Sequence, residues 1–493
     1  MNLSSEPQSR KTGPEKIGPE WGGDYSRVQH HQPIASSLSE PSYHDGASDF
    51  SGDEKSCEHK DLFLAKIGLM VRLTPPKNRC SPDRLPCGAF RRFCWQLFVA
   101  CFALWNIGAI PQAAGLESVT IRQDGAVFTV RGKILAEAQD GGMILRDRQG
   151  KLWPLQPHQI KARTEDDIPY KPLNQEELRA ALLEELPPGF SIHKTKHYLI
   201  CYNTSKKYAE WCGSLLERLF RAYNNFWMRR DLTLSSPEMP LIALVFKDKQ
   251  SYRRYAVGEL GDAVDTIDGY YNMITNRIAM YDLTAAHRND RQQTPIRNLS
   301  EINQLFAQPG AGQVVATVIH EATHQIAFNC GVQQRLSDIP VWLNEGMAMY
   351  FETPDLRSKK GWRGMGEINL NRFARFRKYL QKRPDDSILS LIANADRMQG
   401  RSKDAQYQSP MSLLDAYSEA WAITYYLITY HEEAFIDYLK FLSQKKPGQA
   451  ESDAKKIEDF ENFFGKIELL DKKFVQRMQK EIKRNARNLS KQP

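Results

Sequence analysis

The chain has few cysteines in the part that can form a folded domain. Of its eight cysteines, five lie before residue 102, which leaves Cys201, Cys212 and Cys330 for the rest of the sequence. Three is an odd number, so at most one internal disulfide can form among them, and none has the spacing of a metal site. These absences exclude a disulfide-built scaffold and a cysteine-based zinc site.

Long hydrophobic runs are also scarce, and a single stretch needs separate treatment. Residues 94–110 are biased toward apolar side chains, follow basic residues between 72 and 92, and precede small residues at 113–115. This order is typical of a secretory signal. The run includes Gln96 and Asn106 and is marginal for crossing about 30 Å of bilayer, so an uncleaved membrane anchor is the alternative. In both cases the rest of the chain is expected outside the cytoplasm, in the periplasm, at the cell surface or secreted.

Composition and turn signals divide the N-terminal third. Residues 1–69 are rich in Ser, Pro, Gly, His and charge, and we expect a disordered extension, or a segment upstream of a true start at Met70. Residues 70–115 hold the signal peptide or anchor. Residues 116–164 are expected to form a small all-β module, because short strand-like stretches alternate with glycine turns. Glu165–Asn174 is predicted to be a linker. The predicted strands are Val119–Arg122, Val127–Val130 and Met143–Arg146.

One short motif has metal-binding spacing, namely His320-Glu321-Ala322-Thr323-His324. Two histidines four residues apart on a helix project from one face, so they can hold one Zn²⁺ while the intervening glutamate reaches a bound water. Apolar residues recur at helical spacing over 311–328, which predicts a mostly buried helix. Buried imidazoles and carboxylates are costly unless they pair or bind a metal. The alternative is a solvent-facing polar stripe on an ordinary helix.

A candidate for the third ligand follows downstream. The segment Trp342-Leu343-Asn344-Glu345-Gly346 comes just after Pro340, near the start of a second predicted helix, and twenty residues separate His324 from Glu345. This spacer allows a turn and a return, so Glu345 can point back at the histidines. Two imidazoles and one carboxylate leave a fourth zinc position open, as in catalytic sites. Alternatively, Glu345 is a carboxylate favoured by the dipole near a helix N-terminus.

Together these motifs resemble the gluzincin clan of zinc metallopeptidases, which includes thermolysin and the alanyl-aminopeptidase family. The stretch 194–352 is also similar to an uncharacterised bacterial gluzincin-like family. The resemblance implies that His320, His324 and Glu345 bind one zinc ion, and that Glu321 is the general base that activates a zinc-bound water. It implies a hydrolase whose substrate is a peptide or protein.

The chain departs from these families in two ways. Thermolysin-like enzymes have an aspartate that orients a histidine at the position of Met349, so Asp338, Glu352 or a backbone carbonyl must take that role here. The Gly-x-Met-Glu-Asn segment of alanyl aminopeptidases is missing, which favours an endopeptidase. The alternative is a non-catalytic zinc-binding scaffold or interaction protein that retains a gluzincin fold. Retention of Glu321 favours the enzyme, because a structural site needs no base.

The expected fold class is α+β, with a zincin-like catalytic domain after the small β module. Its N-terminal lobe, 175–355, combines a mixed sheet with the active-site helix, and a helical C-terminal lobe with a basic tail covers 356–493. The continuous apolar run 240–246 predicts a central strand. Residues 270–274 and 277–281 predict a hairpin. In gluzincins such a strand pairs with the extended substrate, although a plain sheet edge fits the same pattern.

The C-terminal lobe contains one further candidate residue and a basic end. A buried helix is predicted over 413–430, and gluzincins place a tyrosine or histidine in this lobe to stabilise the oxyanion. Tyr417 is the candidate and His431 the second choice, although a core role is the favoured interpretation of Tyr417. Residues 472–493 contain eight basic residues and one acid, which predicts a solvated, partly helical tail. No zinc-finger, RNA-recognition or helix-turn-helix pattern is present, so no nucleic-acid partner is expected.

Overall fold

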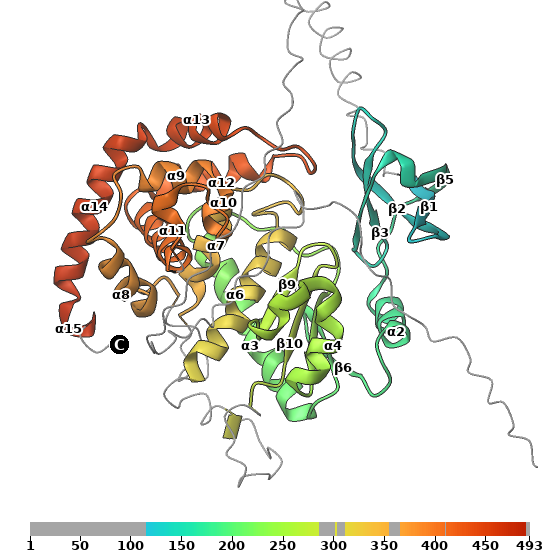
Figure 1. Ribbon diagram of the computed structural model, residues 1–493. Coiled ribbons are helices and arrows are strands. Elements are labelled where there is room, and N and C mark those ends of the chain that lie inside the picture. Colours follow the sequence, from blue (N-terminus) through green and yellow to red (C-terminus); the bar gives the residue numbers. More distant parts are fainter. Residues whose placement is uncertain (1–114, 285–300, 303–310, 354–364, 410, 490–493) are drawn as a thin grey trace, which may run out of the picture. The chain divides into compact units, whose positions relative to one another are not determined.

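The chain is a mixed α/β protein with two five-stranded sheets and a helical C-terminal part, as the computed structural model shows (Figure 1). The structure describes residues 115–284, 301–302, 311–353, 365–409 and 411–489. The predicted extension 1–69 lies outside these ranges, and so does the predicted signal or anchor apart from Gly115. Among the helices in the described ranges, none combines the length and the apolar character that crossing a membrane requires.

The first sheet is antiparallel and has the strand order β4-β3-β2-β1-β5. Its small core contains Val119, Ile121 and Leu145, which are fully buried. The elements are β1 (Gly115–Gln123), β2 (Ala126–Glu137), β3 (Met143–Asp147), β4 (Leu152–Leu155), the 3-10 helix η1 (Pro157–Gln159) and β5 (Ile160–Pro169). The three strands predicted from the sequence lie within β1, β2 and β3.

The linker prediction for Glu165–Asn174 is wrong in its first half. Strand β5 continues to Pro169 and pairs with β1 as far as Gly115. Almost all its side chains are exposed or half-buried, since β5 is an edge strand of the sheet. An exposed edge strand carries polar residues on both faces, so its composition resembles that of a linker. Pairing with β1, not hydrophobic pattern, makes this segment a strand.

The second sheet is mixed and has the order β6-β7-β8-β10-β9. Strands β7, β8 and β10 are parallel, while β6 and β9 are antiparallel to their neighbours. All six residues of β8 are buried, which confirms the predicted central strand. The elements are β6 (Ser191–Lys194), β7 (Tyr198–Tyr202), β8 (Leu241–Phe246), β9 (Gly269–Asn272) and β10 (Arg277–Tyr281). The predicted hairpin is confirmed as β9 and β10.

Helices accompany this sheet, and one of them carries the histidine motif. They are α2 (Gln175–Glu185), α3 (Lys206–Met228), α4 (Lys249–Leu260), the 3-10 helix η2 (Gly261–Asp265) and α6 (Ala311–Asn329). Helix α3 buries a stripe of large side chains that includes Tyr223 and Trp227. Helix α6 contacts α3, β9 and β10. The helix that carries the histidine motif is therefore held between α3 and the β10-β9 edge of the sheet.

The remaining described chain is helical. Its elements are α7 (Val341–Phe351), α8 (Leu370–Tyr379), α9 (Ser387–Ala393), α10 (Ala395–Met398), the 3-10 helix η4 (Ala405–Tyr407), α11 (Ser412–Tyr430), α12 (Glu432–Ser443), α13 (Asp453–Phe464), α14 (Ile467–Arg484) and α15 (Ala486–Leu489). Helix α11 is almost wholly buried and packs against α7 and α8, which confirms the predicted buried helix. Helix α14 carries most of the basic tail.

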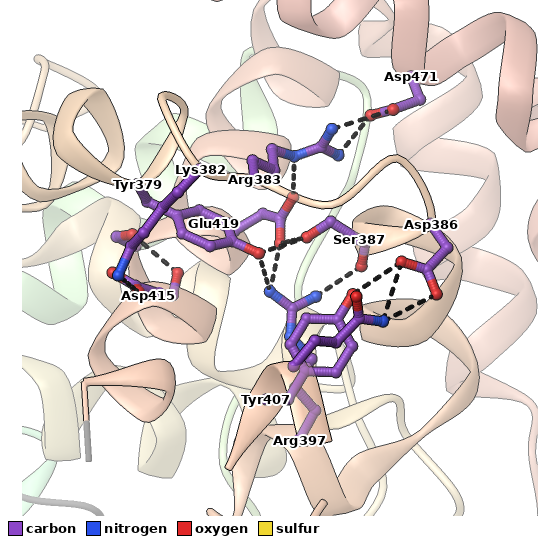
Figure 2. Close-up of polar contacts among 12 residues, drawn as sticks. Tyr379, Lys382, Arg383, Asp386, Ser387, Arg397, Tyr407, Asp415, Glu419 and Asp471 are labelled. Carbon is purple, nitrogen blue, oxygen red and sulfur yellow. Dashed lines mark hydrogen bonds and ion pairs between the residues drawn. The ribbon is translucent and has the colours of Figure 1, made fainter. Parts of the chain in front are cut away.

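A buried charge network fastens α11 to the helices around it (Figure 2). The carboxylate of Glu419 accepts hydrogen bonds from Arg397 at 2.7 Å and from Arg383 at 2.6 Å. Arg383 also forms two bonds to Asp471 on α14. Ser387 donates a third hydrogen bond to Glu419 at 2.6 Å. Because Glu419 is 0% exposed, these partners supply the solvation that burial removes.

Candidate metal centre

Helices α6 and α7 bring His320, His324 and Glu345 together. The Nε2 atoms of the two histidines are 3.1 Å apart, and the Glu345 carboxylate lies 3.2 Å from His320 Nε2 and 3.5 Å from His324 Nε2. All three side chains are buried. Their candidate ligand atoms lie within 4.8 Å of one another, which is close enough to hold one metal ion.

The other ring nitrogen of each histidine has its own acceptor. Nδ1 of His320 lies 2.8 Å from Oε1 of Glu352, and Nδ1 of His324 lies 3.0 Å from Oδ1 of Asn344. An acceptor at Nδ1 fixes the proton there and leaves the Nε2 lone pair directed at the cluster. Glu352 was one of three predicted partners for the histidines. Asp338 was another, but it accepts from the Glu451 backbone and pairs with Lys456 instead.

Glu352 is held by two residues that begin helix α8. Asn369 donates to Oε2 of Glu352 at 3.0 Å, and Arg372 donates to Oε1 at 3.1 Å. Burial disfavours the charged form of Glu352, but Arg372 and His320 outweigh it and lower the pKa of Glu352. Burial also disfavours the imidazolium of His320, yet Glu345 and Glu352 raise its pKa to about 10. The carboxylate at Nδ1 is thus kept ionised and makes the imidazole more basic.

Glu321 lies in the same buried cluster but is not one of the three ligand candidates. Its Oε2 atom accepts a hydrogen bond from the Tyr271 backbone N–H of strand β9 at 2.8 Å. Burial raises the pKa of Glu321 to about 7; His320 opposes this shift and Glu345 reinforces it. A carboxylate with a pKa near 7 can both accept and donate a proton at neutral pH.

Gly346 allows α7 to approach α11 closely, directly beside Glu345. A Cβ atom at Gly346 would lie 2.1 Å from Oγ1 of Thr424 and 2.6 Å from the backbone oxygen of Ala420. Because that oxygen belongs to a buried helix, the two helices would have to separate. The glycine of the Trp-Leu-Asn-Glu-Gly motif is therefore a packing requirement that also sets the position of Glu345.

We expect Gly346→Ala to destabilise the fold by about 1–3 kcal/mol, because the added methyl group has no room. It should also weaken zinc binding, since Glu345 moves with α7. The matched control is Gly258→Ala in α4, where a Cβ meets nothing within 4 Å. That change should stabilise the protein by about 0.5–1 kcal/mol. Urea unfolding of both variants tests the comparison, and equal stabilities would contradict it.

The two candidates for stabilising an oxyanion differ in their surroundings. Tyr417 is buried, and burial together with the charges of Glu345 and Glu321 raises its pKa well above the ordinary value. The carboxylates of the cluster therefore act on this ring. His431 lies at the end of α11, with its Nε2 3.1 Å from the Tyr426 hydroxyl. Burial and the charge of Lys473 lower the pKa of His431. No residue of the histidine cluster contributes to this shift.

The donor set fits a divalent cation. In a tetrahedral zinc site with bonds of about 2.0–2.1 Å, neighbouring ligand atoms are about 3.3 Å apart. The three separations of 3.1, 3.2 and 3.5 Å bracket that value. The cluster also buries the carboxylates of Glu321, Glu345 and Glu352, and buried anions require compensation by cations. Arg372 pairs with Glu352, and a metal ion would supply positive charge beside Glu345.

Zinc uptake is expected to release protons. In the metal-free protein His320 is protonated at pH 7, because its pKa is raised to about 10. A cation that binds Nε2 must displace this proton, so the apparent zinc affinity should rise about tenfold per pH unit between roughly pH 6.5 and 8.5. Calorimetry in two buffers of different ionisation enthalpy measures the released protons. A zinc affinity that stays the same across this pH range would contradict the conclusion that zinc displaces a proton from His320.

A further prediction compares Glu352 and Asp338 as the residue that orients His320. Glu352→Gln removes the charge opposite His320 and should weaken zinc binding by about 10–100-fold. Asp338→Asn should leave zinc affinity unchanged, because the contacts of Asp338 are to Glu451 and Lys456. Competition with a chromogenic chelator measures both constants. The reverse order of effects would show that the acceptor for His320 is wrongly assigned.

Sequence reasoning missed several neighbours of this cluster. Asn344 stands next to Glu345 in the motif, so the adjacency could have indicated its role. Arg372 and Asn369 had no such signal, because they follow Glu352 after a long interval and belong to no short pattern. The Tyr271 N–H is a backbone group and leaves no trace in side-chain identity.

Among curated proteins, no sequence matches the chain. One family model, described as a protein of unknown function (DUF1570), matches residues 314–449. The matched stretch includes both histidines, Glu345 and Tyr417. Over the residues that form the candidate metal centre, the chain is thus similar to a family whose function is not established.

Proposed function

We propose that the protein is a zinc-dependent peptidase, most simply an endopeptidase, in which Glu321 is the general base. The observation that carries this proposal is the division of roles in the cluster. Three side chains supply ligand atoms within 4.8 Å of one another, while Glu321 is buried beside them and is not one of the three. A purely structural metal site needs ligands but has no use for an additional buried base.

The residues of the chain have distinct parts in this proposal. His320, His324 and Glu345 hold the zinc ion, and a zinc ion in such a site acidifies water and polarises a carbonyl group. Glu321 accepts a proton and passes it to the leaving amine, which suits a carboxyl group with a pKa of about 7. Glu352 and Asn344 keep the imidazole rings in the orientation that exposes Nε2.

The proposal also covers the class of the enzyme, its location in the cell and a residue that stabilises the oxyanion. The ligand set and spacing support a gluzincin-type enzyme with a zincin-like catalytic domain. The predicted signal at 70–115 supports export, with a membrane anchor at 94–110 as the alternative. Tyr417 is the candidate for oxyanion stabilisation, supported by the electrostatic influence of Glu345 and Glu321 on its hydroxyl.

A second candidate function is a non-catalytic zinc-binding scaffold. The observation that favours it is Met349, which is completely buried in the core where thermolysin-like enzymes have an aspartate. The contact between Glu352 and His320 weakens this argument, since another carboxylate occupies the orienting role.

Hydrolysis of a peptide library tests the proposal. The protein is purified, stripped with chelator, and reloaded with one equivalent of zinc before incubation with unstructured peptides of mixed sequence. We expect cleavage that depends on zinc, with internal cleavage sites if the enzyme is an endopeptidase. Zinc-loaded protein that cleaves no peptide, with full zinc retention, would support the scaffold function and contradict the peptidase.

A further inference from the structure

Helix α6 has a second polar face beside the one that carries the histidines. Glu321, Gln325 and Asn329 follow one another at intervals of four residues, so they share a face. This face meets strands β9 and β10, which α6 contacts. Gln325 is 0% exposed, and its two side-chain hydrogen bonds go to backbone oxygens outside the metal cluster. A completely buried amide on the helix of the general base requires an explanation.

The side chain of Gln325 joins the helix to strand β8 and to the turn between β9 and β10. Its Nε2 atom donates to the backbone oxygen of Ile242 in β8 at 3.0 Å and to that of Asn276 at 2.9 Å. Asn329 adds a reciprocal pair of amide hydrogen bonds to the Asn276 side chain, at 2.7 and 2.9 Å. Asn276 has a φ of +61°, the left-handed conformation that closes the turn between β9 and β10. Two side-chain amides of the helix, those of Gln325 and Asn329, thus hold this turn.

These hydrogen bonds between α6 and the turn also fix strand β9, which contacts the general base. Among the strands of the described residues, β9 lies at the edge of its sheet and pairs with β10 alone, so its position against α6 depends on these contacts. The Tyr271 hydroxyl donates to the Asn276 side chain at 2.8 Å, and the Tyr271 ring stacks on Phe328 of α6. With Tyr271 held in this way, its backbone N–H donates to Oε2 of Glu321 at 2.8 Å. One carboxylate oxygen is then fixed, and Oε1 is left to exchange a proton.

We infer that Gln325 is a positioning residue for Glu321 and acts through the β9–β10 turn and the Tyr271 N–H. The inference rests on the proposed peptidase function. The side-chain hydrogen bonds of Gln325 go to Ile242 and Asn276, and not to a metal ligand or to Glu321. It sets the direction in which the Glu321 carboxylate points, and a general base is effective only within a narrow range of geometry.

The test compares Gln325→Met with Gln333→Met. Methionine keeps the volume of glutamine but cannot donate a hydrogen bond. Gln333 is a matched control because it is 2% exposed and its amide atoms have no hydrogen-bond partner among the described residues. For Gln325→Met we expect full zinc content, a KM within about twofold of wild type, and kcat lower by roughly 10–100-fold. Gln333→Met should match wild type in all three quantities.

Two further readouts keep the inference testable if one variant folds poorly. Asn329→Ala alters a half-buried residue at the end of α6, and should lower kcat in the same direction by a smaller factor. Hydrogen–deuterium exchange of residues 269–276, followed by mass spectrometry, should be faster in Gln325→Met and Asn329→Ala than in Gln333→Met. Exchange does not depend on activity. It therefore tests whether Gln325 and Asn329 hold the β9–β10 turn even if wild type hydrolyses no peptide.

The outcomes are distinct. Wild-type kcat in Gln325→Met and Asn329→Ala, despite faster exchange at 269–276, would overturn the positioning role. An unchanged exchange rate in both variants would contradict the claim that Gln325 and Asn329 hold the β9–β10 turn. Absence of hydrolysis by zinc-loaded wild type would remove the proposed function, while faster exchange would still support the structural step. A raised KM with unchanged kcat would assign Gln325 to substrate binding and so contradict the inference.

Discussion

Glu321→Gln should lose peptide hydrolysis by about 10²–10⁴-fold while it retains one equivalent of zinc. Glutamine keeps the size and the hydrogen bond from the Tyr271 N–H, but it cannot accept a proton from water. The three ligand candidates do not include Glu321, so zinc content should not change. Steady-state kinetics on a peptide that wild type cleaves, with metal analysis of the same sample, measures both quantities.

The control for this prediction is Glu238→Gln, which alters an exposed carboxylate just before β8 that pairs with Arg146 of β3. It should leave both kinetics and zinc unchanged. If Glu321→Gln retains more than about a tenth of wild-type kcat at full zinc content, general-base catalysis by Glu321 is wrong. If zinc is lost as well, Glu321 acts as a ligand instead of a base.

Glu419→Gln should destabilise the C-terminal helices by about 3–5 kcal/mol, because it leaves Arg397 and Arg383 without their shared anion. The Arg397 side chain is 1% exposed and that of Arg383 is 5% exposed, so water cannot replace the lost carboxylate. Figure 2 shows Glu419 between the two arginines, with Arg383 bonded to it through Nε and directing its terminal nitrogens at Asp471. Urea unfolding at pH 7 measures the difference from wild type. A loss below about 1 kcal/mol would contradict the importance of this pair.

The same network predicts a pH dependence. Burial disfavours ionised Glu419, but Arg397 and Arg383 outweigh it and lower its pKa. A depressed pKa contributes stability that is complete above the ordinary carboxyl pKa of about 4.3 and is lost as pH falls through the lower, folded-state value. The stability difference between wild type and Glu419→Gln should therefore shrink in acid. Glu458→Gln, which breaks an exposed pair with Lys455, should leave stability nearly unchanged at any pH, because water screens this pair.

The elements that carry the metal centre could be predicted because their signals are local. Apolar spacing identified α6, Pro340 identified the start of α7, and the apolar run 240–246 identified the central strand β8. The spacing of His320, His324 and Glu345 was sufficient to suggest that the three side chains meet, since each lies on a regular helix. The structure brings them together within 4.8 Å.

Glu352 could be named in advance as a candidate partner for the histidines. The contacts that hold Glu352 and Glu321 in place could not be predicted, because they join distant parts of the chain. Arg372 reaches Glu352 from α8, and the Tyr271 N–H reaches Glu321 from fifty residues upstream. Strand β5 was mistaken for a linker at Glu165–Pro169, since only its pairing with β1 distinguishes it from polar coil. In each case the deciding interaction is tertiary and leaves no periodic pattern in the sequence.

Zinc K-edge X-ray absorption of protein reloaded with one equivalent of zinc and then dialysed tests the central claim most directly. The account predicts retained zinc, with nitrogen and oxygen ligands at about 2.0–2.2 Å that include two imidazoles. His324→Ala should lose one imidazole from this signal and bind zinc much more weakly. A sulfur shell at about 2.3 Å, or zinc that dialyses away from the wild type, would contradict a metal centre formed by His320, His324 and Glu345.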